Sequence, residues 1–277
     1  MDMLYSVGSS LPEYRVKAIN NSSDSHNLIH KDEYAQRYGF RAGLVPGVSI
    51  YAYMSRSLID FIGRSWLERG SADIRFVHPI YEGEEVRISG CLTSVKKNGT
   101  LCIDYQACNN QGVICAVGTA QLPPELPKSE PLLNDYPAGE GKLHRPISLQ
   151  SLNVGDWLTP VTSEYTWNVH WQYCQKSIRD HHPLYQKILH PGWLLNQANI
   201  ILATNYALSA WIHVSSNVQN YHIQEEEGIV ETRGRIQGKF ERSGNHFIVM
   251  DLAIFAAGHC IETIRHTAIF YIAPKAA

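Results

Sequence analysis

Side chains that could transfer protons cluster near the start of the chain, in the stretch NSSDSHNLIHKDEYAQRYGF over residues 21–40. Asp24, Asn27 and His30 lie within seven positions of one another there. His30 is the strongest candidate, because an imidazole exchanges a proton near neutral pH. The segment is also compatible with a polar loop that caps the helix-like run after it, since Ser, Asp and Asn favour turns and helix starts.

A Pro-Gly pair follows and opens a long apolar stretch. Pro46 suits the first turn of a helix and Gly63 suits its end, so we predict a helix between them. Apolar residues cover nearly every side of this helix, which is typical of a buried one. Its N-terminus would present free N–H donors and positive potential, with Gly47 and Val48 as the candidate donors to an anionic oxygen and Ser49 as an added hydroxyl.

The chain looks like two distant copies of one unit. Gly47 and Gly192 differ by 145 positions, as do Gly83 and Gly228 and also Gly99 and Gly244, while Gly112 and Gly258 differ by 146. A nearly constant offset indicates an internal duplication. The second copy repeats the Pro-Gly pair at the head of a long apolar helix.

A stretch rich in Pro, Gly and charged residues separates the copies and predicts a linker. We therefore expect an N-terminal unit at 1–121, a linker at 122–146 and a C-terminal unit at 147–277. Each unit has a polar segment, a helix and then strands rich in Val, Ile, Phe and Tyr. Long helices against antiparallel strands give an α+β fold.

Composition narrows the function classes. A net charge of −2 with a pI near 6.7 gives no electrostatic case for nucleic acid or for an anionic membrane as partner. No apolar run is long enough to span a bilayer, and the first ten residues do not resemble a signal peptide. No C-x-x-C or H-E-x-x-H motif occurs among the six cysteines and 13 histidines, so we expect no metal or other cofactor and a reducing, cytoplasmic setting.

The order of these features resembles the MaoC-like (R)-specific enoyl-CoA hydratases and dehydratases, which have the hotdog fold. The resemblance is carried by Asn-x-x-His, Pro-Gly, the buried helix, RFVHPIYEGEEV and NNQGVICAVGTAQL. It implies a double hotdog, two copies of an antiparallel sheet wrapped around a long central helix, in one chain. A further pairing of two such chains into a homodimer stays open. It also implies a substrate carried as an acyl thioester on coenzyme A or on an acyl carrier protein.

The motif of that family reads Asp-x-Asn-Pro-aliphatic-His, and each copy keeps part of it. The first copy has Asn27 and His30 but places Ser25 at the Asp position, with Asp24 one residue earlier. The second copy keeps Asp180 and the Pro, whereas His182 and Tyr185 replace the Asn and the His.

The resemblance implies roles for these residues. His30 would transfer protons, Asn27 would position a catalytic group, and a backbone N–H at Gly47 would hold the thioester oxygen. Asp24 is the candidate base if a bulge brings it to the site, and Asp180 would be the remnant of a second half-site. Bulky side chains of the second copy would shape an acyl pocket: Trp193, Tyr206 and Trp211.

The expected activity is hydration of an enoyl thioester or the reverse dehydration. Two other functions stay open. One is hydrolysis of an acyl-CoA by a hotdog thioesterase. The other is binding or tailoring of an acyl or polyketide-like ligand without hydration.

Overall fold

A computed structural model describes residues 5–274 of the chain. Antiparallel strands form one continuous ten-stranded sheet, in the order β1-β3-β4-β5-β2-β9-β12-β11-β10-β7. The first copy contributes β1 (Tyr14–Lys17), β2 (Ser71–Phe76), β3 (Glu85–Val95), β4 (Leu101–Cys108) and β5 (Ile114–Leu122). The second copy contributes β7 (Val161–Tyr165), β9 (Ile212–Asn220), β10 (Gly228–Arg242), β11 (Asn245–Ala256) and β12 (His259–Tyr271).

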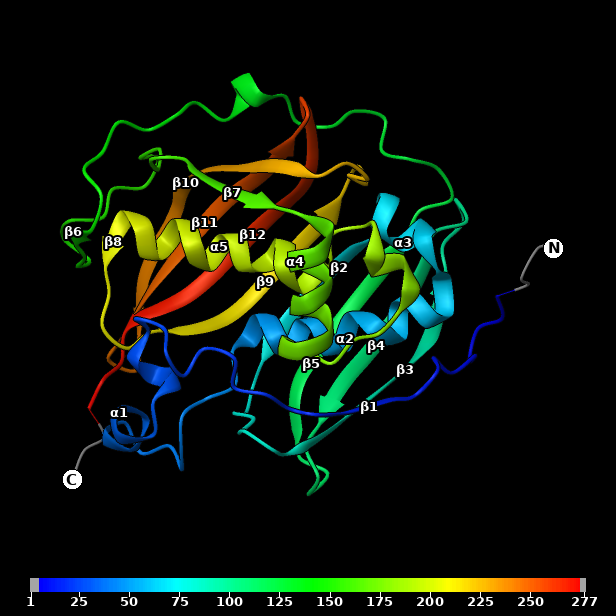
Figure 1. The fold of residues 1–277 in the computed structure, drawn as a ribbon, viewed down its shortest axis with the longest axis horizontal. Coiled ribbons are helices and arrows are strands. Elements are labelled where there is room, and N and C mark those ends of the chain that lie inside the picture. The colour runs from blue at the N-terminus through cyan, green and yellow to red at the C-terminus, as the bar shows by residue number, and fades with distance from the viewer. Residues whose placement is uncertain (1–4, 275–277) are drawn as a thin grey trace.

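Two long helices lie side by side against the concave face of this sheet: α2 (Gly47–Ile62) and α5 (Pro191–Asn205) (Figure 1). The predicted buried helix is confirmed, with Pro46 just before its first turn and Gly63 ending it at φ +79°. Its large side chains are fully buried, as Tyr51, Met54 and Leu58 show. Burial of each such side chain contributes about 1.5–3 kcal/mol, so tertiary packing holds the helix in place.

The pairing of β2 with β9 shows that the two copies are related by an internal two-fold. Ser71 pairs with Gln219, whose counterpart in the first copy is Ile74, because 219 − 145 = 74. Ile74 in turn pairs with Ser216, the counterpart of Ser71, since 71 + 145 = 216. Such reciprocal pairing is the mark of an isologous interface. The sheet therefore continues from one copy to the other without an edge between them.

The remaining elements are short. They comprise α1 (Asp32–Arg37), α3 (Arg64–Arg69), α4 (Trp167–Gln172), the 3-10 turns η1 (Leu28–His30), η2 (Leu133–Asp135) and η4 (Pro183–Gln186), the π-helical turn η3 (Tyr173–Ser177), and a two-stranded parallel pair, β6 (Arg145–Pro146) with β8 (Tyr206–Ala207). The stretch between β5 and β7 runs over the top of the molecule in Figure 1, where Tyr136 packs edge-on against Phe255. The unit and linker boundaries remain predictions.

Candidate functional site

His30 ends the 3-10 turn η1, and both of its ring nitrogens have partners. Nδ1 lies 2.7 Å from the carbonyl oxygen of Leu44 and must therefore carry the proton that it donates. Nε2 lies 3.2 Å from Nδ2 of Asn27, which is a donor, so Nε2 is the unprotonated nitrogen. Burial lowers the pKa of His30 below its usual 6.5, although the bond to Leu44 opposes the shift. The imidazole is therefore neutral at pH 7, with Nε2 as its basic atom.

Asn27 fixes that orientation and joins the two copies. Its Oδ1 accepts from the backbone N–H of Ile29 at 3.2 Å and of Trp211 at 3.1 Å. Its Nδ2 donates to the carbonyl oxygen of Trp211 at 3.0 Å and faces His30. With two accepted bonds on the oxygen, the amide cannot turn over without leaving buried donors unpaired. The side chain that caps η1 thus docks on the backbone at the start of β9.

Gly47 begins α2 close to the start of β9. Within residues 5–274, no side chain caps this helix, and no acceptor pairs with the Gly47 N–H. A Cβ added at Gly47 would lie 2.9 Å from Nδ1 of His213 and 3.1 Å from Cε2 of Phe76. Only glycine therefore fits at this position without displacing a neighbour. The helix start is an anion-binding position whose donor remains available.

A cavity of about 200 Å³ brings these groups together at the junction of the two copies. His30, Asn27 and Gly47 line it from the first copy, together with the apolar residues on both sides of Pro46. The start of β9 closes it from the second copy. Its walls are mostly apolar, and the polar side chains are few: Asn27, His30, His78, Asn199 and His213. A small apolar pocket with a few convergent polar groups is the usual form of a ligand site.

Four other predicted site residues do not line this cavity. Asp24 is exposed in the loop before η1, and Ser25 precedes η1 with its hydroxyl buried and without a partner in the described structure. Val48 and Ser49 are buried in the first turn of α2, where the Ser49 hydroxyl lies 3.2 Å from Oδ1 of Asn21. No carboxylate is among the residues that line the cavity in the described structure.

The structure adds residues that the sequence-based prediction did not include as site residues. Of the three bulky candidates for the acyl pocket, only Trp211 lines the cavity. His213 and Phe76 face Gly47, and their rings meet edge-on at 4.7 Å. The duplication aligns Trp211 with Trp66, and this match is a sequence signal for the segment around Trp211. The position of His213 beside Gly47, in contrast, depends on the pairing of β2 with β9.

The corresponding position in the second copy is closed. His190 takes the place of Val45 before the Pro-Gly pair, and its Nδ1 accepts from the Gly192 N–H at 3.0 Å. Its Nε2–H faces Oδ2 of Asp180 at 3.3 Å, and Arg56 binds the other oxygen of Asp180 at 2.8 Å. Asp180 is thus bonded to both His190 and Arg56. The donor that stays free at Gly47 is occupied at Gly192.

Tyr185 and His182 complete this closed arrangement. The ring of Tyr185 is fully buried and lies 4.1 Å from that of His190, measured between centroids. His182 caps η4 by accepting from the Leu184 N–H at 3.3 Å, as Asn27 caps η1. This shared capping supports the predicted alignment of the two motifs. The cavity beside Pro191 measures only about 10 Å³, too small to admit a substrate.

Burial and hydrogen bonds set the charge state of this network. Burial of Asp180, the largest single influence, would raise its pKa, but the bonds from His190 and the His182 backbone and the charge of Arg56 together lower it. Burial lowers the pKa of His190 despite Asp180. We therefore assign an ionised Asp180 paired with Arg56, and a neutral His190. This network caps and packs α5.

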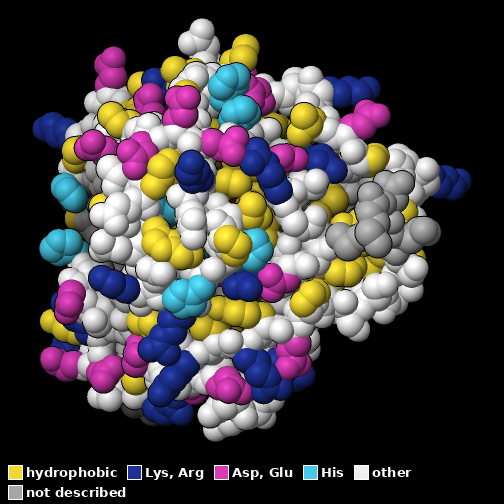
Figure 2. Space-filling model, turned by 45° about the vertical axis from the view of Figure 1, so that its right-hand side comes forward, with side chains coloured by type: hydrophobic (Ala, Val, Ile, Leu, Met, Phe, Trp, Pro, Cys, Tyr) yellow, Lys and Arg dark blue, Asp and Glu magenta, His cyan; other side chains and the backbone are white. Residues whose placement is uncertain are grey.

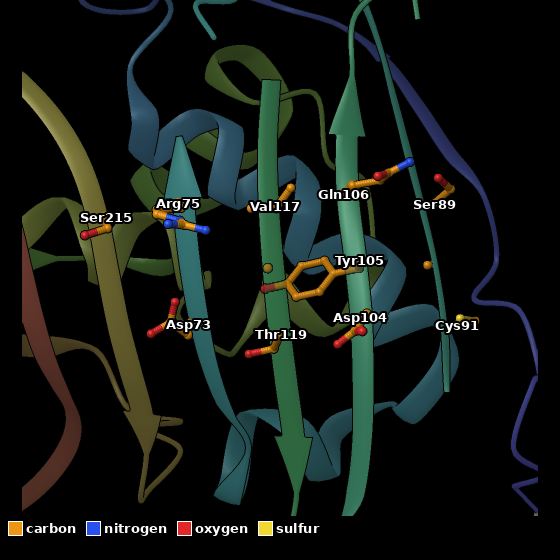
Figure 3. Close-up of a pocket in the computed structure, with 12 residues that line it drawn as sticks. Asp73, Arg75, Ser89, Cys91, Asp104, Tyr105, Gln106, Val117, Thr119 and Ser215 are labelled. Atoms are coloured by element: carbon orange, nitrogen blue, oxygen red, sulfur yellow. The ribbon is translucent and has the colours of Figure 1, made fainter. Parts of the chain in front are cut away.

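A larger hollow of about 750 Å³ lies on the opposite, outer face of the sheet. Figure 3 shows two rows of its side chains, with Asp73, Thr119, Asp104 and Cys91 in one and Arg75, Val117, Gln106 and Ser89 in the other. The buried ring of Tyr105 packs against Gly118, where a Cβ would be 2.6 Å from it. The hollow is open to solvent and holds no histidine among its described lining residues. The mostly apolar cavity at His30, with its basic imidazole and free helix N–H, is therefore the better candidate site.

The rest of the described structure offers few other sites. In residues 5–274, no group of three or more His, Cys, Asp or Glu side chains is arranged to hold a metal ion. No helix in that range is long and apolar enough to cross a membrane. On the face in Figure 2, basic and acidic side chains are interspersed, as the small net charge leads one to expect.

Solved structures of similar shape were found, each with low sequence identity. A protein from Chloroflexus aurantiacus described as a MaoC domain dehydratase superimposes with a TM-score of 0.68 at 12% identity, covering 97% of this chain and 96% of its own. A Mycobacterium tuberculosis protein with a double hotdog fold gives 0.60 at 11%, covering 94% and 96%. A protein from Thermobifida fusca described as a thioesterase II gives 0.54 at 12%, covering 93% and 91%.

No protein-family model and no curated protein matches the sequence. The chain has the double hotdog fold, and its recognised resemblance to MaoC-like dehydratases is confirmed at that level. Because dehydratases and thioesterases share the fold, the fold alone does not select between their activities.

Proposed function

We propose that the chain acts on an acyl thioester by hydrating a trans-2-enoyl group to the (R)-3-hydroxyacyl product, or by the reverse dehydration. The observation that carries the proposal is the cavity that faces the basic Nε2 of His30, the Asn27 amide and the free Gly47 N–H. Addition of water to an enoyl thioester needs a base, a proton source and a donor to the developing enolate, and these groups can supply all three.

In the proposed reaction, a water molecule takes the place of Asn27 at the Nε2 lone pair of His30. The Asn27 amide then donates to the water oxygen while Nε2 removes a proton from the water. The hydroxide oxygen bonds to the β-carbon, and the π electrons move onto the thioester oxygen, where the Gly47 N–H holds them. The imidazolium of His30 then returns the proton to the α-carbon. One histidine thus serves first as base and then as acid.

The cavity volume limits the substrate. About 200 Å³ is less than the 300–1,000 Å³ typical of drug-sized ligands, so the proposed acyl group is short. Coenzyme A or an acyl carrier protein would carry it. All six cysteines are free thiols, which supports a reducing, cytoplasmic setting. A further homodimer of the double hotdog is part of the proposal.

The test is to mix the protein with crotonyl-CoA and with a longer trans-2-enoyl-CoA, and to follow loss of the conjugated-thioester absorbance. Replacement of His30 by Ala should lower the rate about 10²–10⁴-fold, the usual contribution of a positioned acid–base group. His26→Ala is the matched control, because His26 is exposed in the same loop and does not line the cavity. An unchanged rate in His30→Ala would refute the assignment.

The absence of a carboxylate among the described cavity residues keeps the two alternatives in view. Release of free CoA thiol from butyryl-CoA, with no hydrated product from crotonyl-CoA, would identify a thioesterase. Tight binding of acyl-CoA with no product over hours would identify a ligand-binding or tailoring role. Each outcome replaces hydration as the proposed activity while leaving the site in place.

A further inference from the structure

His213 is a buried imidazole in the cavity wall that the proposed reaction does not use. It stands at the start of β9 and is 6% exposed. Its Nδ1 has no hydrogen-bond partner within residues 5–274. The same atom is the nearest neighbour of a Cβ built on Gly47, at 2.9 Å. An unpaired polar atom of the second copy thus lies beside the free helix start of the first.

The other nitrogen of this ring belongs to a short, buried series of hydrogen bonds. His213 Nε2 lies 2.8 Å from the hydroxyl oxygen of Ser216, which lies 3.2 Å from Nδ1 of His266. His266 is fully buried, its ring centroid is 4.2 Å from that of His213, and its Nε2 has no partner in the described structure. One hydroxyl proton therefore stands between two imidazoles.

Burial keeps both rings neutral. It lowers the pKa of His213 well below 6.5, with the neighbouring His266 adding to the effect and a bond to the Ser215 backbone opposing it, and it lowers the pKa of His266 to about 3. Each ring then carries a single proton, and the Ser216 hydroxyl can donate to only one of them. The Ser216 hydroxyl therefore donates either to His213 or to His266, and the other imidazole donates to it.

The two directions differ in what they leave unpaired. If Ser216 donates to His266, then His266 holds a buried N–H at Nε2 with no acceptor, an uncommon arrangement in folded proteins. In that case Nδ1 of His213 would also be a bare acceptor at a helix start, yet no N–H donates to it. If Ser216 donates to His213, the unpaired N–H is instead Nδ1–H of His213, which lines the cavity and can meet a ligand there, and the unpaired acceptor is Nε2 of the fully buried His266.

We propose that His213 is a second donor to the thioester oxygen, acting through Nδ1–H beside the Gly47 N–H. Ser216 and His266 are positioning residues that hold this tautomer. A neutral imidazole near a helix N-terminus is an effective electrophile toward a carbonyl that becomes an enolate. The inference rests on the proposed thioester substrate and adds to it a donor from the second copy. The counterpart of His213 in the first copy, Glu68, instead forms an ion pair with Arg64.

The direct test is the carbonyl stretching band of butyryl-CoA labelled with ¹³C at the thioester carbonyl. Binding is measured in a His30→Gln background, so that neither hydration nor hydrolysis consumes the probe. His213→Phe keeps the ring against Phe76 but has no donor, whereas His213→Asn places an amide nitrogen near the Nδ1 position. The control is His78→Phe, since His78 lines the cavity and is bonded to the Ile114 carbonyl instead.

On binding, the carbonyl band should move to lower frequency when residue 213 is His or Asn, and the shift should be smaller in His213→Phe. In the otherwise unmodified protein, His213→Phe should lower kcat about 10²–10³-fold, the usual loss for one oxyanion donor, with little change in KM. A band in His213→Phe equal to that of the background protein would overturn the inference. Failure of butyryl-CoA to bind would overturn both the inference and the proposed function.

Tautomer assignment by ¹⁵N NMR gives a second measurement that needs no substrate. The expected result is a proton on Nδ1 of His213 and a bare Nε2, whereas the opposite assignment would overturn the inference. The two proposals can fail separately. A band shift that depends on His213 without any hydration refutes only the hydratase, whereas hydration without that dependence refutes only the role of His213.

Discussion

Gly47 and Gly192 occupy equivalent positions of the duplication, so one substitution in each copy separates catalysis from packing. A Cβ at Gly47 would lie 2.9 Å from His213 and 3.1 Å from Phe76, both in the cavity wall. A Cβ at Gly192 would lie 2.5 Å from Cβ of Ala52 and 3.1 Å from the Val48 carbonyl oxygen, where α5 packs on α2. The same methyl group therefore meets the site in one copy and a helix interface in the other.

Gly47→Ala should lower kcat for hydration about 10²–10³-fold, because the methyl group displaces the thioester oxygen from its donor. The free energy of unfolding of this variant should change little. Ala is favoured over Gly in a helix by up to about 1 kcal/mol, which offsets part of the cost of crowding against His213 and Phe76. Gly192→Ala should cost about 1–3 kcal/mol from overpacking, because backbone and a helix methyl cannot move aside easily. At about 2–4 °C per kcal/mol, the melting temperature should fall by several degrees.

The assays are the initial rate with crotonyl-CoA at 25 °C and the urea or thermal unfolding midpoint of each variant. Gly192→Ala should keep most of its kcat while it remains folded. Full kcat in Gly47→Ala would mean that the start of α2 is not the oxygen-binding position. A loss of kcat in folded Gly192→Ala as large as that in Gly47→Ala would mean that the loss reports the packing of α2 and not a contact with the substrate oxygen.

Three further outcomes are expected. Glu262 is fully buried without a partner in residues 5–274, and burial raises its pKa well above 4.5. Stability should therefore fall by up to about 1.4 kcal/mol per pH unit from 4.5 upward, and urea midpoints of Glu262→Gln should lack this slope. Asp180→Ala leaves Nε2 of the buried His190 without a partner, while Arg56 keeps its ion pair with Asp60; the change should cost about 1–3 kcal/mol in urea unfolding, with no loss of hydration rate in the folded protein. The lowered pKa of Asp180 means that its own stabilisation is present above 3.8 and is lost only as pH falls through the lowered value. Because burial lowers the pKa of His30, kcat/KM should be level above pH 6.5 and decline only at more acid pH; an acid limb above 6.5 would contradict its role as base.

Local sequence patterns were sufficient for much of the fold. The 145-residue glycine offset predicted two copies, and the β2–β9 register repeats that offset. Pro46 and Gly63 marked the limits of α2 because they restrict the backbone at those positions. Asn27 and His30 could be singled out together because their Asn-x-x-His spacing resembles the MaoC-like motif, and the structure brings them into contact across a 3-10 turn.

Contacts between distant residues required the tertiary structure. Nothing near position 24 indicates that its carboxylate faces solvent, and nothing near 190 indicates that a histidine blocks the Gly192 N–H. His213 is 166 positions from Gly47, since 213 − 47 = 166, and strand pairing between the copies places it there. The physical reason is that local sequence sets backbone conformation, whereas the partner of a buried polar atom depends on which elements pack against it. The two copies therefore share a fold, and packing leaves one with an open helix start and the other with a closed one.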